Sequence, residues 1–341
     1  MLHLDTIRYM GNKSKLLSYI IPAIQEVTPA GGTVCDLMTG SNTVSYALKE
    51  FFTVYTNDVQ EYCRIISDAV ITNQTEIISS HSVLEEIKPL FDQNHRKHEF
   101  DFFNQTYSGT YFSASQCRDI DSIRYAIESI TNPHRKALYL FALMGAMCLV
   151  QSTPGHFAQY MPSTHKRIIP LQQMDLWEEF LKKCDLYSNI YFSSYENKSF
   201  CMDYKDLFRT GELDTVDTIY LDSPYSQEQY SRFYHILETV AKYDSPVVKH
   251  KAGYREDRFM SDFCYKSKVQ NEFATIFSFC KSKGINLVIS YSNKAVLPIN
   301  DLEDLCKEYF CELTILEVAH KHSTQGKGSQ KIAEIIITCH N

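Results

Sequence analysis

One stretch constrains the fold of this chain more than any other: residues 218–225, which read Thr-Ile-Tyr-Leu-Asp-Ser-Pro-Tyr. An apolar, β-rich run ends there in an acid, and a Ser-Pro turn then carries an aromatic residue away from the strand. In an open α/β sheet, ligands bind at the carboxyl ends of the strands. We therefore expect Asp222 and Tyr225 to lie at the mouth of a cleft in such a sheet.

The chemistry of this turn suits a nucleobase that carries an amino group. A carboxylate such as that of Asp222 accepts hydrogen bonds from an amine. An aromatic face such as that of Tyr225 can stack on a flat base, which is worth roughly 1–3 kcal/mol. The same residues also fit a strand end without any function, so the interpretation depends on the rest of the chain.

Two βα units near the N-terminus indicate a nucleotide-binding fold. Residues 33–37 form a short apolar strand, a loop with Gly40 follows, and a helix is expected over residues 43–51. The second strand, residues 52–56, leads to Asp58, which lies about 20 residues past the glycine loop. An acid at this place typically accepts hydrogen bonds from ribose hydroxyls, although it could also cap the helix that follows. The two roles are compatible.

Beyond these units the pattern changes twice. Helical stretches replace the alternation of strand and helix between about residues 74 and 189, and the α/β pattern then resumes. We therefore predict an α/β fold with a mostly parallel seven-stranded sheet, helices on both faces and a helical insertion. The expected helices are residues 13–25, 83–94, 116–130, 133–151, 171–186 and 269–283. The pattern resumes at residues 190–194, and the later strands are residues 200–204, 217–222 and 286–290 and an antiparallel pair, 313–319 and 332–338, joined by a polar loop, 321–328.

Four motifs resemble those of a known family. Residues 222–225, Asp-Ser-Pro-Tyr, resemble the Asp-Pro-Pro-Tyr motif of amino-methylating DNA methyltransferases. Residues 229–235, Gln-Tyr-Ser-Arg-Phe-Tyr-His, look like its continuation in one adenine-specific group. Residues 8–13, Arg-Tyr-Met-Gly-Asn-Lys, resemble the Tyr-x-Gly-Gly-Lys cofactor motif, and residues 36–42 resemble the Asp-x-Phe-x-Gly-x-Gly loop. Because these motifs occur in family order over most of the chain, it is similar to Dam-like, D12-class adenine-specific (N6) DNA methyltransferases.

The resemblance implies a fold, a reaction and a cofactor. The fold would be the Rossmann-like class I methyltransferase fold, with a catalytic domain over residues 1–73 and 190–341 and an inserted helical target-recognition region over residues 74–189. The reaction would transfer a methyl group from S-adenosylmethionine to the N6 amine of a flipped-out adenine in DNA, in a restriction-modification or phage-defence setting. The amine would meet the Asp222 side chain and the Ser223 carbonyl, with Pro224 shaping the turn and Tyr225 stacking on the base.

The resemblance also implies a cofactor pocket, in which Lys13 would hold the methionine carboxylate and Asp203 the adenine amino group. Two departures from the family pattern bear on activity: Asn42 replaces a glycine and could crowd the cofactor, and Ser223 replaces proline. Met38 replaces the usual phenylalanine and is flexible enough to fill the same space. The expected cofactor-binding residues are Tyr9, Lys13, Asp36, Met38, Gly40, Asp58 and Asp203.

Net charge offers little support for DNA binding, because 34 basic and 41 acidic residues give −7. Local basic groups could still contact phosphates, although each group also fits a solvated surface. The densest concentration of cations follows the turn at residues 222–225. The candidate DNA contacts are Arg96, Lys97, Arg135, Lys136, Lys166, Arg167, Lys249, Lys251 and Arg255.

Several classes of protein are disfavoured. The eleven cysteines contain no Cys-x-x-Cys pair, which indicates reduced thiols in a cytoplasmic protein and no zinc site. No apolar stretch is long enough to span a membrane, and no signal peptide is apparent. We expect no metal, and expect DNA and a restriction endonuclease or other defence protein as partners. Two alternatives stay open: a member of the fold without catalysis, or methylation of cytosine N4 or of an RNA base.

Overall fold

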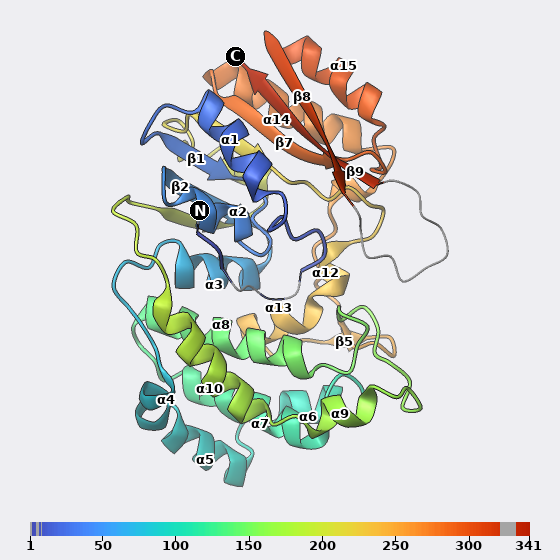
Figure 1. Ribbon diagram of the computed structural model, residues 1–341. Helices are drawn as coiled ribbons and strands as arrows, with labels where there is room; N and C mark the ends of the chain where they lie inside the picture. Colours follow the sequence, from blue (N-terminus) through green and yellow to red (C-terminus); the bar gives the residue numbers. More distant parts are fainter. Residues whose placement is uncertain (1, 5–6, 8, 321–331) are drawn as a thin grey trace.

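A computed structural model describes residues 2–4, 7, 9–320 and 332–341. Arg8 and the polar loop predicted over residues 321–328 lie outside the described residues. Figure 1 shows a twisted sheet in the upper half of the view and a group of helices below it. Among the described residues, no helix is both long enough and apolar enough to cross a membrane.

The sheet has seven strands in the order β3-β2-β1-β4-β7-β9-β8. The first five of these pair in parallel, and β9 is antiparallel to both β7 and β8. The mostly parallel seven-stranded sheet predicted from the sequence is therefore confirmed. The strands are β1 (Thr33–Asp36), β2 (Thr53–Asp58), β3 (Lys198–Cys201), β4 (Thr218–Leu221), β7 (Asn286–Ser292), β8 (Glu312–His320) and β9 (Ile332–His340).

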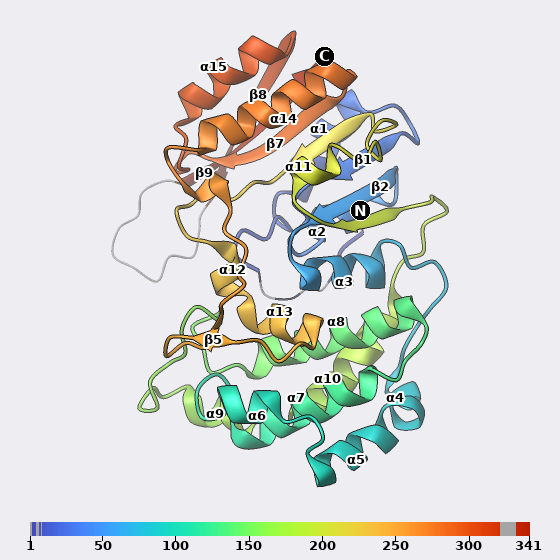
Figure 2. The same cartoon turned by 180° about the vertical axis from the view of Figure 1, so that it is seen from behind.

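Both faces of the sheet are covered, which explains why the central strand β4 is buried along its whole length. In β4, Tyr220 lies in the same core as residues of α1 and α3, whereas Ile219 and Leu221 lie in the core beneath α14 and α15. Figures 1 and 2 show these helices on opposite faces. The helices are α1 (Leu17–Val27), α2 (Thr43–Leu48), α3 (Glu61–Val70), α11 (Tyr204–Leu207), α14 (Val269–Lys283) and α15 (Ile299–Tyr309).

The helical region packs against one of these faces. Its long buried helix α8 contacts α3 and α13 (His235–Lys242), and the buried side chains of all three belong to one continuous core. The cores of the insertion and of the sheet are therefore joined through α3, as both views indicate. The helices of the region are α4 (Ser80–Glu86), α5 (Lys88–Lys97), α6 (Phe102–Tyr107), α7 (Ala114–Ile127), α8 (Pro133–Val150), α9 (Ile168–Gln173) and α10 (Leu176–Leu186).

Several predicted helices have other bounds in the structure. The helix expected over residues 83–94 is broken at Ile87, because Pro89 favours the start of a new helix. The helix expected over residues 171–186 is broken before Asp175, whose side chain caps α10 by accepting from the Glu178 N–H. The helix expected from residue 13 begins at Leu17, after a turn.

Residues 190–194, where the α/β pattern was expected to resume, do not form a strand. The backbone of Tyr191 is bound by side chains instead of a neighbouring strand. Its N–H donates to the Tyr46 hydroxyl at 2.7 Å, and its carbonyl accepts from the Lys49 ammonium at 2.6 Å. This prediction was wrong because the sequence does not show which partner satisfies the backbone groups.

Candidate active site

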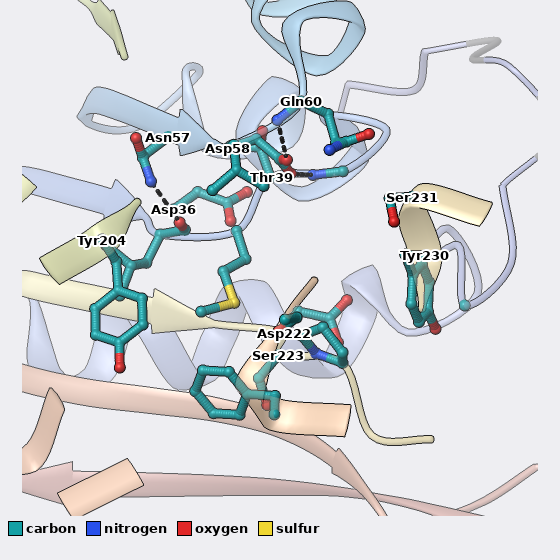
Figure 3. A pocket seen from close by; sticks show the side chains of 18 of the residues that line it. Asp36, Thr39, Asn57, Asp58, Gln60, Tyr204, Asp222, Ser223, Tyr230 and Ser231 are labelled. Atoms are coloured by element: carbon teal, nitrogen blue, oxygen red, sulfur yellow. Dashed lines mark hydrogen bonds between the residues drawn. The ribbon is translucent and has the colours of Figure 1, made fainter. Parts of the chain in front are cut away.

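The order of strands reverses between β1 and β4, which is where ligands bind in open α/β sheets. A cavity lies at this point, with an empty volume of about 1260 Å³ including its open mouth. Figure 3 shows acidic side chains from the ends of β1, β2 and β4 around it, together with Tyr204 and Tyr230. The cavity is lined by Tyr9, Lys13, Asp36, Met38, Gly40, Asp58, Asp203, Asp222, Ser223, Pro224 and Tyr225, which are all the residues predicted for cofactor and catalysis.

Asp222 directly follows β4 and lines the cavity. Its side chain is 22% exposed, and its Oδ1 lies 3.0 Å from the Lys13 ammonium. Burial raises the pKa of Asp222 to about 6, and the positive charge of Lys13 opposes that rise. The carboxylate is therefore ionised at neutral pH and can accept hydrogen bonds there.

A second carboxylate shares the same lysine. Glu334 of β9 places Oε2 at 3.7 Å from the Lys13 Nζ, and the side chains of both residues are only 3% exposed. Burial would lower the pKa of Lys13, but the carboxylates of Asp222 and Glu334 hold it above its usual value. The ammonium predicted to hold a methionine carboxylate is thus engaged by two carboxylates of the protein, and its contact with a cofactor stays a prediction.

Tyr225 stands beside this pair and is closely packed. Its ring centroid lies 5.1 Å from the Lys13 ammonium, within the range of a cation–π contact. Gly11 has a φ of +80°, and a Cβ at that position would lie 2.8 Å from the Tyr225 hydroxyl. The carbonyl of Tyr225 accepts a hydrogen bond from the Val296 N–H at 3.0 Å, which fixes the end of the turn.

Ser223 occupies the position at which the resemblance implies proline. It is 1% exposed, and its hydroxyl has no hydrogen-bond partner among the described residues. The backbone carbonyl that the chemistry requires is present with serine as with proline. The hydroxyl is therefore an addition to the turn for which the structure shows no role.

The glycine loop accommodates its unusual asparagine. Asn42 adopts the left-handed conformation, with φ 59° and ψ 18°, which asparagine tolerates better than most residues. Its side chain is fully buried, donates to the Cys63 carbonyl at 3.0 Å and accepts from the Ser67 hydroxyl at 2.6 Å. Because these contacts direct the side chain toward α3, it does not line the cavity. The Asn42 side chain therefore does not crowd the cavity, as the sequence had suggested it could.

Gly40 is required by a close neighbour. Its φ is +50°, and a Cβ there would lie 2.8 Å from the Tyr9 ring. That ring stacks on Tyr234, with centroids 4.7 Å apart and planes at 7°. The N-terminal motif and the glycine loop therefore pack closely against each other at one side of the cavity.

The acids that line the cavity are held by the backbone and by neighbouring hydroxyls. Asp58 accepts from the Gly40 and Gln60 N–H groups, each at 3.0 Å (Figure 3). Asp36 accepts from the Ser45 hydroxyl through one oxygen, and its other oxygen has no hydrogen-bond partner among the described residues. Burial raises the pKa of Asp36 to about 7.

Asp203 lies at the edge of this group. Its side chain caps α11 by accepting from the Lys205 N–H at 2.8 Å, and it also lines the cavity. The predicted cofactor acids from β1, β2 and the β3 loop are therefore brought to one cavity.

A comparison with protein families identifies the family of this chain. The family described as D12 class N6 adenine-specific DNA methyltransferase matches residues 9–303. The chain belongs to this family. The match includes all four motifs that carried the resemblance except Arg8, as well as the helical insertion.

Relatives of this D12-class chain include proteins named as modification methylases. Modification methylase LlaI of Lactococcus lactis subsp. lactis is 28% identical over 97% of this chain and 54% of its own length. Type II methyltransferase M.FokI of Planomicrobium okeanokoites is 28% identical over 89% of this chain and 47% of its own length. Type II methyltransferase M2.HphI of Haemophilus parahaemolyticus is 23% identical over 98% of this chain and 97% of its own length. The chain thus spans about half the length of the first two relatives and nearly all of the third.

The basic residues predicted for DNA binding fall into two groups in this D12-class chain. Arg255 is 2% exposed and its guanidinium binds both Asp244 and Asp257, so we now assign it to the stability of its loop and not to a DNA surface. Arg135 is bound by Glu86, and Lys136 is bound by Glu128. The exposed group comprises Arg96, Lys97, Lys166, Arg167, Lys249 and Lys251.

Sequence reasoning missed Glu334. The sequence feature that could have revealed it is the presence of an acid within the apolar run of β9, because an unpaired buried charge is costly. Its partner, Lys13, lies at the other end of the chain, and their proximity follows only from the sheet order.

Proposed function

We propose that this chain transfers a methyl group from S-adenosylmethionine to the N6 amine of adenine in DNA. The observation that carries the proposal is the position of Asp222 and Tyr225 at the carboxyl end of β4, in one cavity with Asp36 and Asp58. Membership of the D12 class supports adenine over cytosine and DNA over RNA. The names of the relatives support a restriction-modification setting.

The residues of the turn address the weak nucleophilicity of the adenine amine, whose lone pair is delocalised into the ring. The Asp222 carboxylate would accept a hydrogen bond from one amino hydrogen, and the Ser223 carbonyl would accept one from the other. These two bonds would draw the nitrogen toward a tetrahedral geometry. Tyr225 would stack on the base and hold it in line for attack. Because the base must leave the duplex, a few kcal/mol of unstacking must be offset by contacts in the cavity.

The cavity also suits the methyl donor, which supplies an electrophilic methyl group on a sulfonium when bound. The unpartnered Asp36 oxygen is an acceptor for an ammonium group. Each Asp58 oxygen already accepts one N–H and has a further lone pair for a ribose hydroxyl. Asp203 would meet the adenine, while Tyr9, Met38 and Gly40 line the pocket between these ends.

Replacing Asp58 by alanine is expected to weaken S-adenosylmethionine binding about 5- to 150-fold, corresponding to roughly 1–3 kcal/mol. The change removes the proposed ribose acceptor and also the brace on the Gly40 N–H. Calorimetric titration with S-adenosylmethionine measures the effect. Asp206→Ala is the matched control, because Asp206 is a mostly exposed acid that pairs with Arg209 outside the cavity. Equal affinities in the two variants would contradict the assigned pocket.

We further propose DNA as the partner and a cytoplasmic location, with a restriction endonuclease as the functional counterpart. The exposed cations Lys166, Arg167 and Lys251 would contact phosphates, and so would Lys249, whose ammonium also pairs with Glu256. Residues 74–189 would form the target-recognition region beside a catalytic domain made of residues 1–73 and 190–341.

Tritiated S-adenosylmethionine and mixed-sequence duplex DNA test the proposed function directly. We expect label in the DNA, and N6-methyladenine after digestion and mass analysis of the nucleosides. Label found as N4-methylcytosine would support the cytosine alternative. A protein that binds cofactor and DNA but transfers no label would support the alternative without catalysis.

A further inference from the structure

The mouth of the cavity carries apolar side chains that the proposed chemistry does not use. Met10, Phe259 and Met260 line the cavity, yet they are 41%, 36% and 47% exposed. Side chains that line a cavity and are also this exposed lie at its opening. Large apolar groups gathered around the entrance of a polar site indicate a surface for binding.

Two of these residues belong to a short segment, residues 259–261, which we call the strap. Its backbone is fixed by side chains of the segment that follows the catalytic turn. The Ser231 hydroxyl donates to the Phe259 carbonyl at 2.6 Å. The Gln229 side chain accepts from the Ser261 N–H at 2.7 Å and donates to the Ser261 carbonyl at 3.0 Å. Gln229 and Ser231 are buried, so these bonds are shielded from water.

The strap and Met10 are both tied to the part of the cavity that holds the catalytic turn. Met10 directly precedes Gly11, where a Cβ would lie 2.8 Å from the Tyr225 hydroxyl. Gln229 and Ser231 flank Tyr230, whose ring also lines the cavity (Figure 3). The backbone positions of the exposed apolar groups are therefore set relative to the catalytic turn, and their side chains are partly exposed.

This combination matches the needs of a base that leaves the duplex. Apolar side chains stabilise an extruded or unstacked base through contact with its faces or by filling the gap it leaves. Such contacts do not depend on the sequence around the base. Methionine is suited to the role because its flexible side chain adapts to irregular surfaces.

We propose that Met10, Phe259 and Met260 contact the flipped-out target base at the entrance of the cavity and hold it there before methyl transfer. The inference rests on the proposed function. It adds residues that hold the base at the entrance to the residues of the turn that contact its amine. An alternative occupant of the strap is the adenine of the cofactor, and the measurements below separate the two.

The test uses the full chain, tritiated S-adenosylmethionine and mixed-sequence duplex DNA. The Phe259→Ala, Met260→Ala double variant is expected to lose about tenfold or more of the rate of methyl transfer at saturating cofactor. Its calorimetric affinity for S-adenosylmethionine and its melting temperature should equal those of the wild type. The conservative Phe259→Tyr variant should retain most of the rate, because it keeps the ring.

Tyr265→Ala is the matched control. Tyr265 is an exposed aromatic residue of similar exposure, 39%, in the same part of the chain, but it does not line the cavity. An active wild type with a double variant no slower than Tyr265→Ala would overturn this inference and leave the proposed function standing. A weakened cofactor affinity that accounts for the lost rate would overturn it in favour of the cofactor adenine. A wild type that never labels DNA would overturn the proposed function and this inference with it.

Discussion

Replacing Asp222 by alanine is expected to reduce the rate of methyl transfer at least about 100-fold, the range seen when one charge-stabilising group is removed from an active site. In the proposed function the carboxylate accepts a hydrogen bond from the amine, and it is ionised at neutral pH because its pKa is about 6. Cofactor affinity should persist, since Asp222 faces the target base in this proposal. Single-turnover kinetics with tritiated S-adenosylmethionine and calorimetry measure the two effects.

Ser223→Pro is the companion variant, because it restores the family motif without removing the backbone carbonyl. The Ser223 hydroxyl has no partner among the described residues, so we expect a change in rate below about tenfold, or roughly 1.4 kcal/mol of barrier. An Asp222→Ala protein that keeps a tenth of the wild-type rate would contradict the assigned role. If the wild type is inactive and Ser223→Pro is active, the loss of activity would be assigned to Ser223.

The elements that sequence predicts well are those whose signal is local. The apolar run of β4 and its acidic end follow from eight consecutive residues, and helix α14 has the bounds predicted from its periodicity. Asp36, Asp58 and Asp222 could be placed in one cavity because the carboxyl ends of parallel strands meet at one edge. The general arrangement of the site therefore follows from the shared direction of the parallel strands.

The features that sequence did not predict depend on partners distant in the chain. The side chain of Asn42 turns away from the cavity because the Cys63 carbonyl and the Ser67 hydroxyl are within reach, which no local pattern shows. Arg255 belongs to a basic stretch, yet two acids remove it from the surface. Charge along the sequence does not reveal which cations remain free to meet phosphate.

The cluster of Lys13, Asp222 and Glu334 also joins residues distant in the chain, and it affects the charge of Asp222. One buried ammonium lies 3.0 Å from Asp222 and 3.7 Å from Glu334. Burial has the largest effect on the pKa of Asp222 and raises it. The charge of Lys13 lowers this pKa, and the charge of Glu334 raises it. Other titratable groups around Asp222 are Asp36, Tyr220, Tyr225 and Tyr230.

Neutral replacements of the two partners are expected to move the pH dependence of methyl transfer in opposite directions. The wild-type rate should rise with pH through about 6, as Asp222 loses its proton and becomes an acceptor. Lys13→Met removes the cation and brings two carboxylates together, so the pKa of Asp222 should rise and the rate at pH 7 should fall strongly. Glu334→Gln removes the competing anion, so the acid limb of the profile should move to lower pH.

Rate profiles from pH 5 to pH 9 at saturating cofactor separate this electrostatic role from a structural one. Lys13→Met also breaks a buried ion pair, which can cost about 3–5 kcal/mol of stability, so its melting temperature must be measured beside its rate. Glu334→Gln keeps the shape of the side chain and serves as the matched test, because a loss of packing would lower the rate at every pH without moving the limb. An acid limb that stays in place in both variants would show that Lys13 and Glu334 do not set the charge of Asp222.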